Sequence, residues 1–283
     1  MQVIDEMAGD IDKIYVSHHL SAYKTERSLH THPVSYEMML FKSGNVDYFI
    51  NDVTYHLNSG DLTFVCPNDI HGLLIRDETP YERIPVHIGE IYKEVFSTQD
   101  TDLFACFHHS VSDRVYHLSQ GEQTLYEEYA LNILHTINRR CFGYDVKIKA
   151  YVSLLLLLAN QVTHLHTPSS YDISPPVIKE TMNFITCHLT EELSVQRIAD
   201  ALNISRSRLS HLFKQFVGTS LWNYVTIRRI QYAQTLLNNG SSITNACYEC
   251  GFNDYAHFIK VFSSLNGISP GKYIKSLSFK RDQ

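Results

Sequence analysis

The sequence has little of what would place it in a membrane or in an oxidising compartment. Its longest apolar run, around Tyr151–Ala159, is far shorter than the roughly 18 residues that a membrane span requires. The first residues are acidic and contain no apolar stretch of the kind found in secretory signals. Only six cysteines occur, and the one close pair, Cys247 and Cys250, has no second CxxC or nearby His pair to complete a zinc site. We therefore expect a soluble, cytoplasmic chain with reduced, structural thiols.

A basic excess over the whole chain is also missing, because the formal net charge is −6. The two parts of the chain nevertheless differ. Residues 1–176 contain 12 Lys and Arg against 23 Asp and Glu, whereas residues 177–283 contain 12 against 7. The acidic total therefore hides a basic C-terminal part, so the net charge does not exclude binding to nucleic acid. The length of 283 residues suits two domains of roughly 100–200 residues each.

A change in composition falls between these two parts. The segment Thr163–Pro176 is rich in Pro, Ser and His and follows a helical pattern, which indicates a linker at 167–176. Before it, short β-branched or aromatic runs alternate with turn signals, as in VDYFINDVTYHLNSGD. Over about 14–110 we expect these strands to close into a small barrel or jelly roll, because closure removes exposed strand edges.

A helical period follows the strands within the first domain, residues 1–166. From Gly121 onward, Leu125, Tyr129, Ile133 and Ile137 recur at every fourth position, and a second apolar helix is expected over about 145–163. Packing on the barrel and contact with a second copy of the chain would both cover such helices, and the pattern does not separate the two.

The second domain, residues 177–283, contains an internal repeat. Ser205–Val225 aligns with Asp254–Ile274 at an offset of 49 residues. In each copy, a small residue (Ala199, Cys247) lies four positions before a residue that tolerates a left-handed backbone (Asn203, Gly251). A polar cap and a second amphipathic helix come next. This order is typical of a helix-turn-helix unit, and two copies in a basic domain make the pattern specific.

The part of the sequence that contains this repeat resembles the AraC-type transcriptional regulators. The resemblance rests on LSVQRIADALNISRSRLSHLFKQFVGTSLWNYVTIRRIQYAQTLL and ITNACYECGFNDYAHFIKVFSSLNGISPGKYI, within the last 100 residues or so. It implies two helix-turn-helix units joined by a long helix, here about 220–237, which spaces two recognition helices for successive major-groove segments. Ala246, Cys247 and Ser263 depart from the residues usual in the family.

The expected DNA-binding residues form the exposed faces of the two recognition helices. The first face has more groups for hydrogen bonding to bases, so we expect it to dominate sequence readout. The second face should contribute mainly positioning and backbone affinity. The first face consists of Ser207, Ser210, His211 and Lys214, with Arg206 and Arg208 at the start of the helix. The second consists of Ala256, Ile259, Lys260 and Ser263, flanked by Tyr255 and His257.

The barrel resembles the cupin-like sensor domain that many of these regulators carry. HTHPVSYEMMLFKSG and GDLTFVCPNDIH stand in place of the two cupin motifs, although the first lacks its leading glycine and the second is one residue longer before Pro67. In cupin enzymes His30, His32, Glu37 and His71 would be the metal ligands. Sensor domains usually bind an organic ligand without metal, so we expect no metal and assign these four to the polar groups of a small effector. Further pocket candidates are Tyr36, Phe41, Tyr48, Arg83 and His87.

The sequence thus predicts an α+β chain with an N-terminal cupin-like β-barrel, flanking helices and a C-terminal all-α domain. We expect a cytoplasmic DNA-binding transcriptional regulator, an activator on family grounds, with no cofactor and no enzymatic activity. The expected partners are double-stranded operator DNA, a small effector for which carbohydrate is one class, RNA polymerase and a second copy of the chain. The alternatives are a metal- or redox-sensing regulator and, with less support, a metal-dependent cupin enzyme, which would leave the basic domain unexplained.

Overall fold

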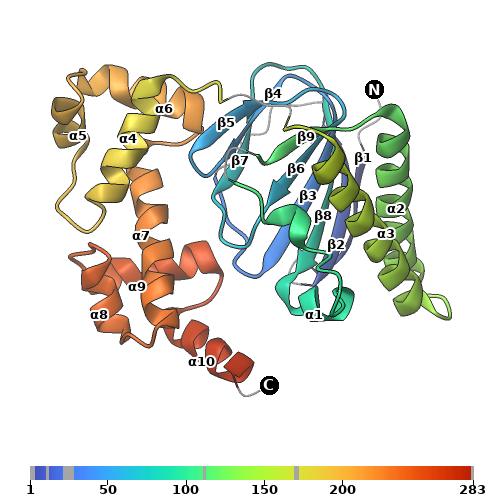
Figure 1. Ribbon diagram of the computed structural model, residues 1–283. Coiled ribbons are helices and arrows are strands. Elements are labelled where there is room, and N and C mark those ends of the chain that lie inside the picture. The colour runs from blue at the N-terminus through green and yellow to red at the C-terminus, as the bar shows by residue number, and fades with distance from the viewer. Residues whose placement is uncertain (1–3, 11–12, 22–28, 111–112, 169–171, 282–283) are drawn as a thin grey trace. The chain divides into compact units, whose positions relative to one another are not determined.

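The computed structural model describes residues 4–10, 13–21, 29–110, 113–168 and 172–281, with the side chains of the last helix described as far as Lys275 (Figure 1). The chain divides into two compact units, Met1–Ile173 (unit 1) and Ser174–Gln283 (unit 2). This division lies within the linker expected at 167–176, of which residues 169–171 lie outside the described part. The α+β class is confirmed, because unit 1 is built on β-sheets and unit 2 is helical.

Unit 1 contains two antiparallel sheets that face each other. The larger sheet has the order β1-β2-β8-β3-β6-β9 and the smaller one β5-β4-β7. The predicted barrel therefore has the two-sheet form of a jelly roll. A core that includes Met39, Phe41, Tyr48 and Leu73 fills the space between the sheets. The strands are β1 (Ile4–Gly9), β2 (Ile14–Ser21), β3 (Ser35–Ser43), β4 (Val46–Ile50), β5 (Val53–His56), β6 (Asp61–Val65), β7 (His71–Ile75), β8 (Tyr81–Gly89) and β9 (Val115–His117).

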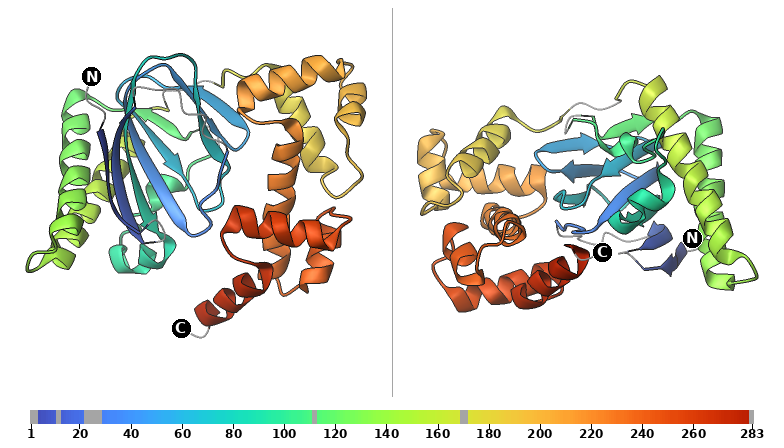
Figure 2. Two further views of the ribbon diagram at one scale, coloured as in Figure 1. Left: turned by 180° about the vertical axis from the view of Figure 1, so that it is seen from behind. Right: turned by 60° about the horizontal axis from the view of Figure 1, so that its bottom comes forward.

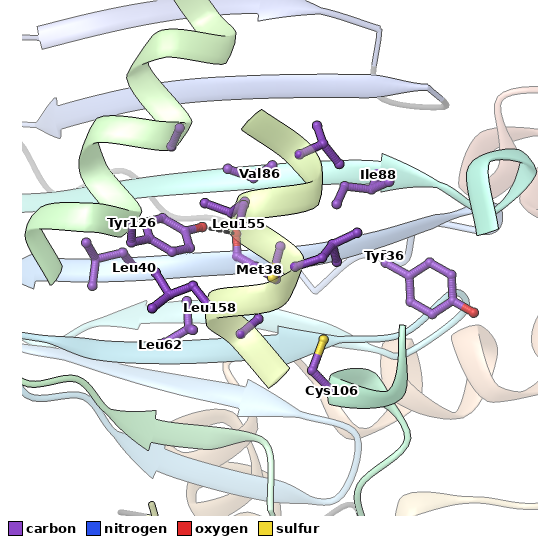
Figure 3. Close-up of a cluster of buried hydrophobic side chains, with 14 of the residues drawn as sticks. Tyr36, Met38, Leu40, Leu62, Val86, Ile88, Cys106, Tyr126, Leu155 and Leu158 are labelled. Atoms are coloured by element: carbon purple, nitrogen blue, oxygen red, sulfur yellow. Dashed lines mark hydrogen bonds between the residues drawn. The ribbon is translucent and has the colours of Figure 1, made fainter. Parts of the chain in front are cut away.

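Strand β3 contributes to two cores because its side chains alternate between the two faces of the sheet. Met39 and Phe41 point between the sheets, whereas Met38 and Leu40 belong to the outer core. That outer face is covered by α2 (Gln120–Arg139) and α3 (Tyr144–Leu165), which confirms the two helices expected from the sequence. Figures 2 and 3 show both helices lying against the larger sheet. The short helix α1 (Lys93–Phe96) and two 3₁₀ turns, Glu90–Tyr92 and Ala105–Phe107, complete unit 1.

Tyr126 anchors α2 to the larger sheet. It is fully buried, and its hydroxyl donates to the carbonyl oxygens of Met38 at 2.9 Å and Ile84 at 3.2 Å. Leu125, the first residue of the predicted apolar stripe of α2, is 39% exposed. The predicted stripe therefore does not coincide completely with the buried face of the helix. A capping box between Ser119 and Glu122 begins the helix by satisfying its free N–H groups.

Helix α3 is also part of the core of unit 1. By length and composition alone it could cross a membrane. Its side chains Val152, Leu155 and Leu156 are fully buried and pack in the outer core of the larger sheet. Other apolar side chains of α3, such as Val146 and Leu165, are exposed to solvent.

Unit 2 consists of seven helices over its described residues: α4 (Pro176–Cys187), α5 (Val195–Ala201), α6 (Arg206–Val217), α7 (Leu221–Asn238), α8 (Ile243–Glu249), α9 (Tyr255–Asn266) and α10 (Pro270–Arg281). Helix α7 packs on α6 at one end and on α8 and α9 at the other. It is the long helix expected at about 220–237, and it joins two helix-turn-helix units, α5–α6 and α8–α9.

Replacing Tyr126 with Phe should destabilise unit 1 alone. The change removes a hydroxyl from two buried carbonyl contacts and leaves the ring in place, so we expect the free energy of unfolding to fall by about 1 kcal/mol. Urea unfolding followed by circular dichroism measures the change. The fluorescence of Trp222, the one tryptophan of the chain, reports on unit 2 and should keep its midpoint. Tyr129→Phe on the same helix is the matched control, and an equal effect of the two substitutions would contradict the anchoring role.

Candidate functional site

The interior of unit 1 brings Glu37 together with a group of histidines. Glu37 is on the inner face of β3, and the register pairs it with His87 on β8. His71 is the first residue of β7, next to Ile50 of β4. His30 meets His71 through an isolated antiparallel bridge, with reciprocal backbone hydrogen bonds of 3.0 Å. The segment His30–His32, which precedes β3, thus lies close to the part of the strand that contains Glu37.

The carboxylate of Glu37 lies at the centre of this group. Its Oε2 is 3.3 Å from Nε2 of His32, 3.4 Å from Nε2 of His71 and 3.6 Å from Nε2 of His87. The other oxygen, Oε1, accepts a hydrogen bond of 3.3 Å from the Tyr48 hydroxyl. Glu37, His71 and His87 are all buried. The sequence prediction that His30, His32, Glu37 and His71 converge is therefore confirmed as geometry, and His87 adds a further imidazole.

Burial and charge set the protonation states of these side chains. Burial alone would raise the pKa of Glu37, but the imidazoles of His87, His32 and His71 outweigh it and hold that pKa well below its ordinary range. Burial lowers the pKa of His87 to about 4 against the opposing effect of Glu37. Burial and the charge of Glu37 raise the pKa of Tyr48 well above its usual value. At neutral pH the centre thus contains a carboxylate, a neutral His87 imidazole and a neutral phenol.

Three imidazole nitrogens of the centre have no hydrogen-bond partner among the described residues. They are Nε2 of His32, Nε2 of His71 and Nδ1 of His87. The opposite nitrogen of His71, Nδ1, lies 2.8 Å from the carbonyl oxygen of Asp69. A carbonyl only accepts, so Nδ1 of His71 carries the hydrogen, and in the neutral ring Nε2 is a bare lone pair.

The residues of the centre fit the metal ion that cupin enzymes hold. Donor atoms of His30, His32, Glu37 and His71 all lie within 4.8 Å of one another. Three imidazoles and one carboxylate are a donor set that first-row transition metals accept, and a bound ion would act as a Lewis acid toward a polar ligand. The same atoms could instead hydrogen-bond an organic effector.

The other pocket candidates divide between the core that lies between the two sheets and the outer core of the larger sheet. Phe41, Tyr48 and Arg83 are buried, and Phe41 and Tyr48 line the core between the sheets. Arg83 contacts Met39 there, with Nη1 3.8 Å from Sδ. The prediction for Tyr36 is wrong, because its ring packs on Phe104 and Phe107 in the outer core. Figure 3 shows Tyr36 in this outer core with Met38 and Leu40. Because Tyr36 is adjacent to Glu37 on β3, their two side chains point to opposite faces of the sheet.

In unit 2, local signals position the first recognition helix, α6. Asn203 has φ 52°, as the predicted left-handed turn requires, and the Ser205 side chain caps α6 by accepting from the backbone N–H of Arg208. Leu209 and Phe213 are buried. All six predicted DNA-binding residues of α6 are exposed: Arg206, Ser207, Arg208, Ser210, His211 and Lys214.

The second recognition helix, α9, presents fewer polar groups. Its N-cap is Asp254, whose side chain accepts from the backbone N–H of His257. Tyr255, Ala256, His257 and Lys260 are exposed, as expected. Ile259 is only half-exposed and packs against the core of unit 2. The face opposite Phe258 and Phe262 therefore offers Lys260 as its one long cationic side chain.

Sequence reasoning missed Arg229, which braces the turn of the second unit. This α7 side chain is buried, donating from Nε to the Leu189 carbonyl at 2.9 Å and from Nη2 to the Glu191 carbonyl at 2.8 Å. Its guanidinium lies beside Gly251, where an added Cβ would be 2.9 Å from Arg229 Cζ. An arginine on an amphipathic helix is usually exposed, so the one available signal was the left-handed glycine at 251.

Comparison with known proteins gives two matches at the family level. Residues 14–90 match the model of an AraC-like ligand-binding domain, and residues 198–276 match that of a helix-turn-helix domain. The first match covers the strands that hold Glu37 and His71, and the second covers both recognition helices.

Individual relatives are similar to longer parts of the chain. The Msm operon regulatory protein of Streptococcus mutans is 25% identical over 92% of this chain and 92% of its own length. The HTH-type transcriptional activator RhaR of Pectobacterium carotovorum is 25% identical over 87% of this chain and 85% of its own. The uncharacterised HTH-type transcriptional regulator YdeC of Bacillus subtilis is 28% identical, and this match spans about half of each protein, 53% and 54%.

Replacing Gly251 with Ala should destabilise unit 2 far more than the same change at Gly240. Both glycines have φ +91°, but an added Cβ at Gly240 meets nothing within 4 Å, whereas at Gly251 it meets Arg229 and the Leu189 carbonyl. The backbone strain is thus matched, and the steric difference should cost about 1–3 kcal/mol more at Gly251. Urea unfolding followed by Trp222 fluorescence measures both variants. Equal losses would show that Arg229 does not constrain this turn.

Proposed function

The chain belongs to the AraC-type transcriptional regulators, and from this premise we propose that unit 1 binds its effector at the Glu37 centre and thereby controls operator binding by unit 2. Sequence-specific DNA binding under effector control is the activity of the family. The assignment of particular residues to each ligand is our proposal. Activation rather than repression, and a cytoplasmic location, are part of it by analogy with the family.

The exposed face of α6 is the observation that supports the DNA-binding assignment best. Six exposed polar or cationic side chains lie on a helix whose apolar stripe, Leu209 and Phe213, is buried. Arg206 and Arg208 are in its first turn, where side chains can reach both phosphates and base edges in a major groove. Residues 177–283 also contain 12 Lys and Arg against 7 Asp and Glu, and this positive charge favours the approach of unit 2 to DNA.

The Glu37 centre supports the effector assignment because it is polar, buried and incompletely hydrogen-bonded. Leaving such nitrogens without partners costs free energy, which a ligand with suitable groups would recover. Catalysis is not part of the proposal. The relatives are transcriptional regulators, and turnover of an effector would destroy the signal that it carries.

An exposed apolar stripe on α3 supports a homodimer. Val146, Leu154, Leu157 and Leu165 are between 40% and 79% exposed, at spacings that bring them to one side of the helix. The opposite side of α3 is buried in unit 1, so both uses expected for this helix are compatible. We propose that a second copy of the chain binds this stripe, and that RNA polymerase is a further partner of an activator.

Substitutions on the two recognition helices should have different effects on DNA binding. His211→Ala removes a side chain that can read base edges, so the preferred sequence should change at one position, by about 1–3 kcal/mol of discrimination. Lys260→Ala should weaken binding to all sequences and reduce the salt slope by about 0.9. Selection from a random DNA library with the full chain, followed by anisotropy titrations at several salt concentrations, measures both. If both variants, His211→Ala included, lost affinity without a change of preferred sequence, the assignment would be contradicted.

The DNA-binding activity should reside in unit 2 alone. A fragment of residues 174–283 has both recognition helices and its own core, so it should bind the selected sequence without effector. A fragment of residues 1–173 should not bind it. Anisotropy titrations with the same DNA measure both fragments. A folded 174–283 fragment that does not bind would show that unit 1 or its dimer contacts are required.

A further inference from the structure

The distances around Glu37 do not suit hydrogen bonds from charged imidazoles. Such bonds between N⁺–H and a carboxylate measure about 2.7–2.9 Å. Nε2 of His32 and Nε2 of His71 lie 3.3 Å and 3.4 Å from Oε2 of Glu37, and neither nitrogen has a hydrogen-bond partner among the described residues. Both nitrogens nevertheless lie close to the same carboxylate oxygen, so hydrogen bonding does not explain their arrangement.

The same distances match those between two ligands of one metal ion. Zinc–nitrogen and zinc–oxygen bonds are about 2.0–2.2 Å, and two ligands at tetrahedral angles are then about 3.4 Å apart. The two observed separations, 3.3 Å and 3.4 Å, agree with this value. His30 supplies a fourth donor atom, and all four donors lie within 4.8 Å of one another.

The neighbours of these ligands hold them in the state that a metal requires. The Asp69 carbonyl takes the hydrogen of His71 Nδ1 at 2.8 Å, which leaves Nε2 as the free lone pair. The Tyr48 hydroxyl donates to Oε1 of Glu37 and leaves Oε2 available. Metal-binding imidazoles and carboxylates in proteins are commonly fixed by such outer partners. These contacts do not follow from the ligand motif, and they belong to this chain.

We infer that the Glu37 centre binds one divalent first-row transition metal ion through His32, His71 and Glu37, with His30 as the fourth ligand, and that this ion is the effector of the regulator. Three nitrogen donors out of four exclude Mg²⁺ and Ca²⁺, which take oxygen ligands. The second part rests on the proposed function, because it assumes that unit 1 controls DNA binding. The inference departs from the metal-free pocket that the sequence led us to expect.

Cobalt titration of the full chain tests the site. The protein is stripped with a chelator, freed of any affinity tag and titrated with Co²⁺ while its visible ligand-field absorption is recorded. We expect saturation at one ion per chain, displacement by Zn²⁺, and a thermal midpoint that rises with metal concentration because the ion binds the folded state. Glu37→Gln and His71→Ala should lose the absorption band. His117→Ala, which removes a half-exposed histidine paired with Asp61, should retain it.

The outcomes separate the site from its regulatory role. Absence of a one-to-one cobalt complex in the wild-type chain would overturn the metal site, whatever the variants do, and would leave DNA selection by the same protein as the test of the proposed function. If the ion is the effector, saturating Zn²⁺ should change affinity for the selected DNA about 5- to 150-fold, and Glu37→Gln should abolish this change. A bound ion without effect on DNA affinity would overturn the effector assignment alone.

Discussion

The buried carboxylate of Glu37 is the constraint on which the interior of unit 1 depends. A charge without partners inside a protein is costly, so the surrounding groups must compensate for it. Here three imidazoles and the Tyr48 hydroxyl surround one carboxylate that is 3% exposed. They come from strands of both sheets and from the segment before β3. The Glu37 carboxylate is therefore in contact with side chains of both sheets, and a ligand bound beside it would be close to both sheets.

This geometry explains why unit 1 is suited to sensing. Two backbone hydrogen bonds join His30 to His71 at the start of β7. A ligand that completes the coordination or hydrogen bonding of His32 and His71 would therefore change the position of the segment His30–His32 relative to β7. The rest of unit 1 is a conventional apolar core under α2 and α3. In unit 2, the buried Arg229 likewise connects segments that are distant in the sequence. It donates hydrogen bonds to two carbonyl oxygens before α5 and lies against Gly251 in the turn before α9.

Local signals made much of this structure predictable. Asn203 and Gly251 both take the left-handed conformation that the repeat required, and the capping residues Ser194, Ser205, Ser242 and Asp254 each accept from a backbone N–H in the first turn of their helices. Contacts between distant segments were harder to predict. Tyr36 was placed in the pocket although its parity with Glu37 on β3 directs it to the outer core, and the contacts of His71 with Asp69 and of Arg229 with Leu189 depend on loop geometry that spacing does not encode.

We propose that the Glu37 centre and the recognition helices are coupled. Coupling between two binding sites is reciprocal, so DNA must change the affinity of the centre for its ligand by the same factor that the ligand changes the affinity for DNA. Calorimetric titration of Co²⁺ into the full chain, with and without saturating amounts of the selected DNA, measures this factor directly. If the two sites are coupled, the two Co²⁺ affinities differ, and their ratio equals that found from DNA titrations with and without Co²⁺. Identical Co²⁺ affinities in the presence and absence of DNA would contradict it.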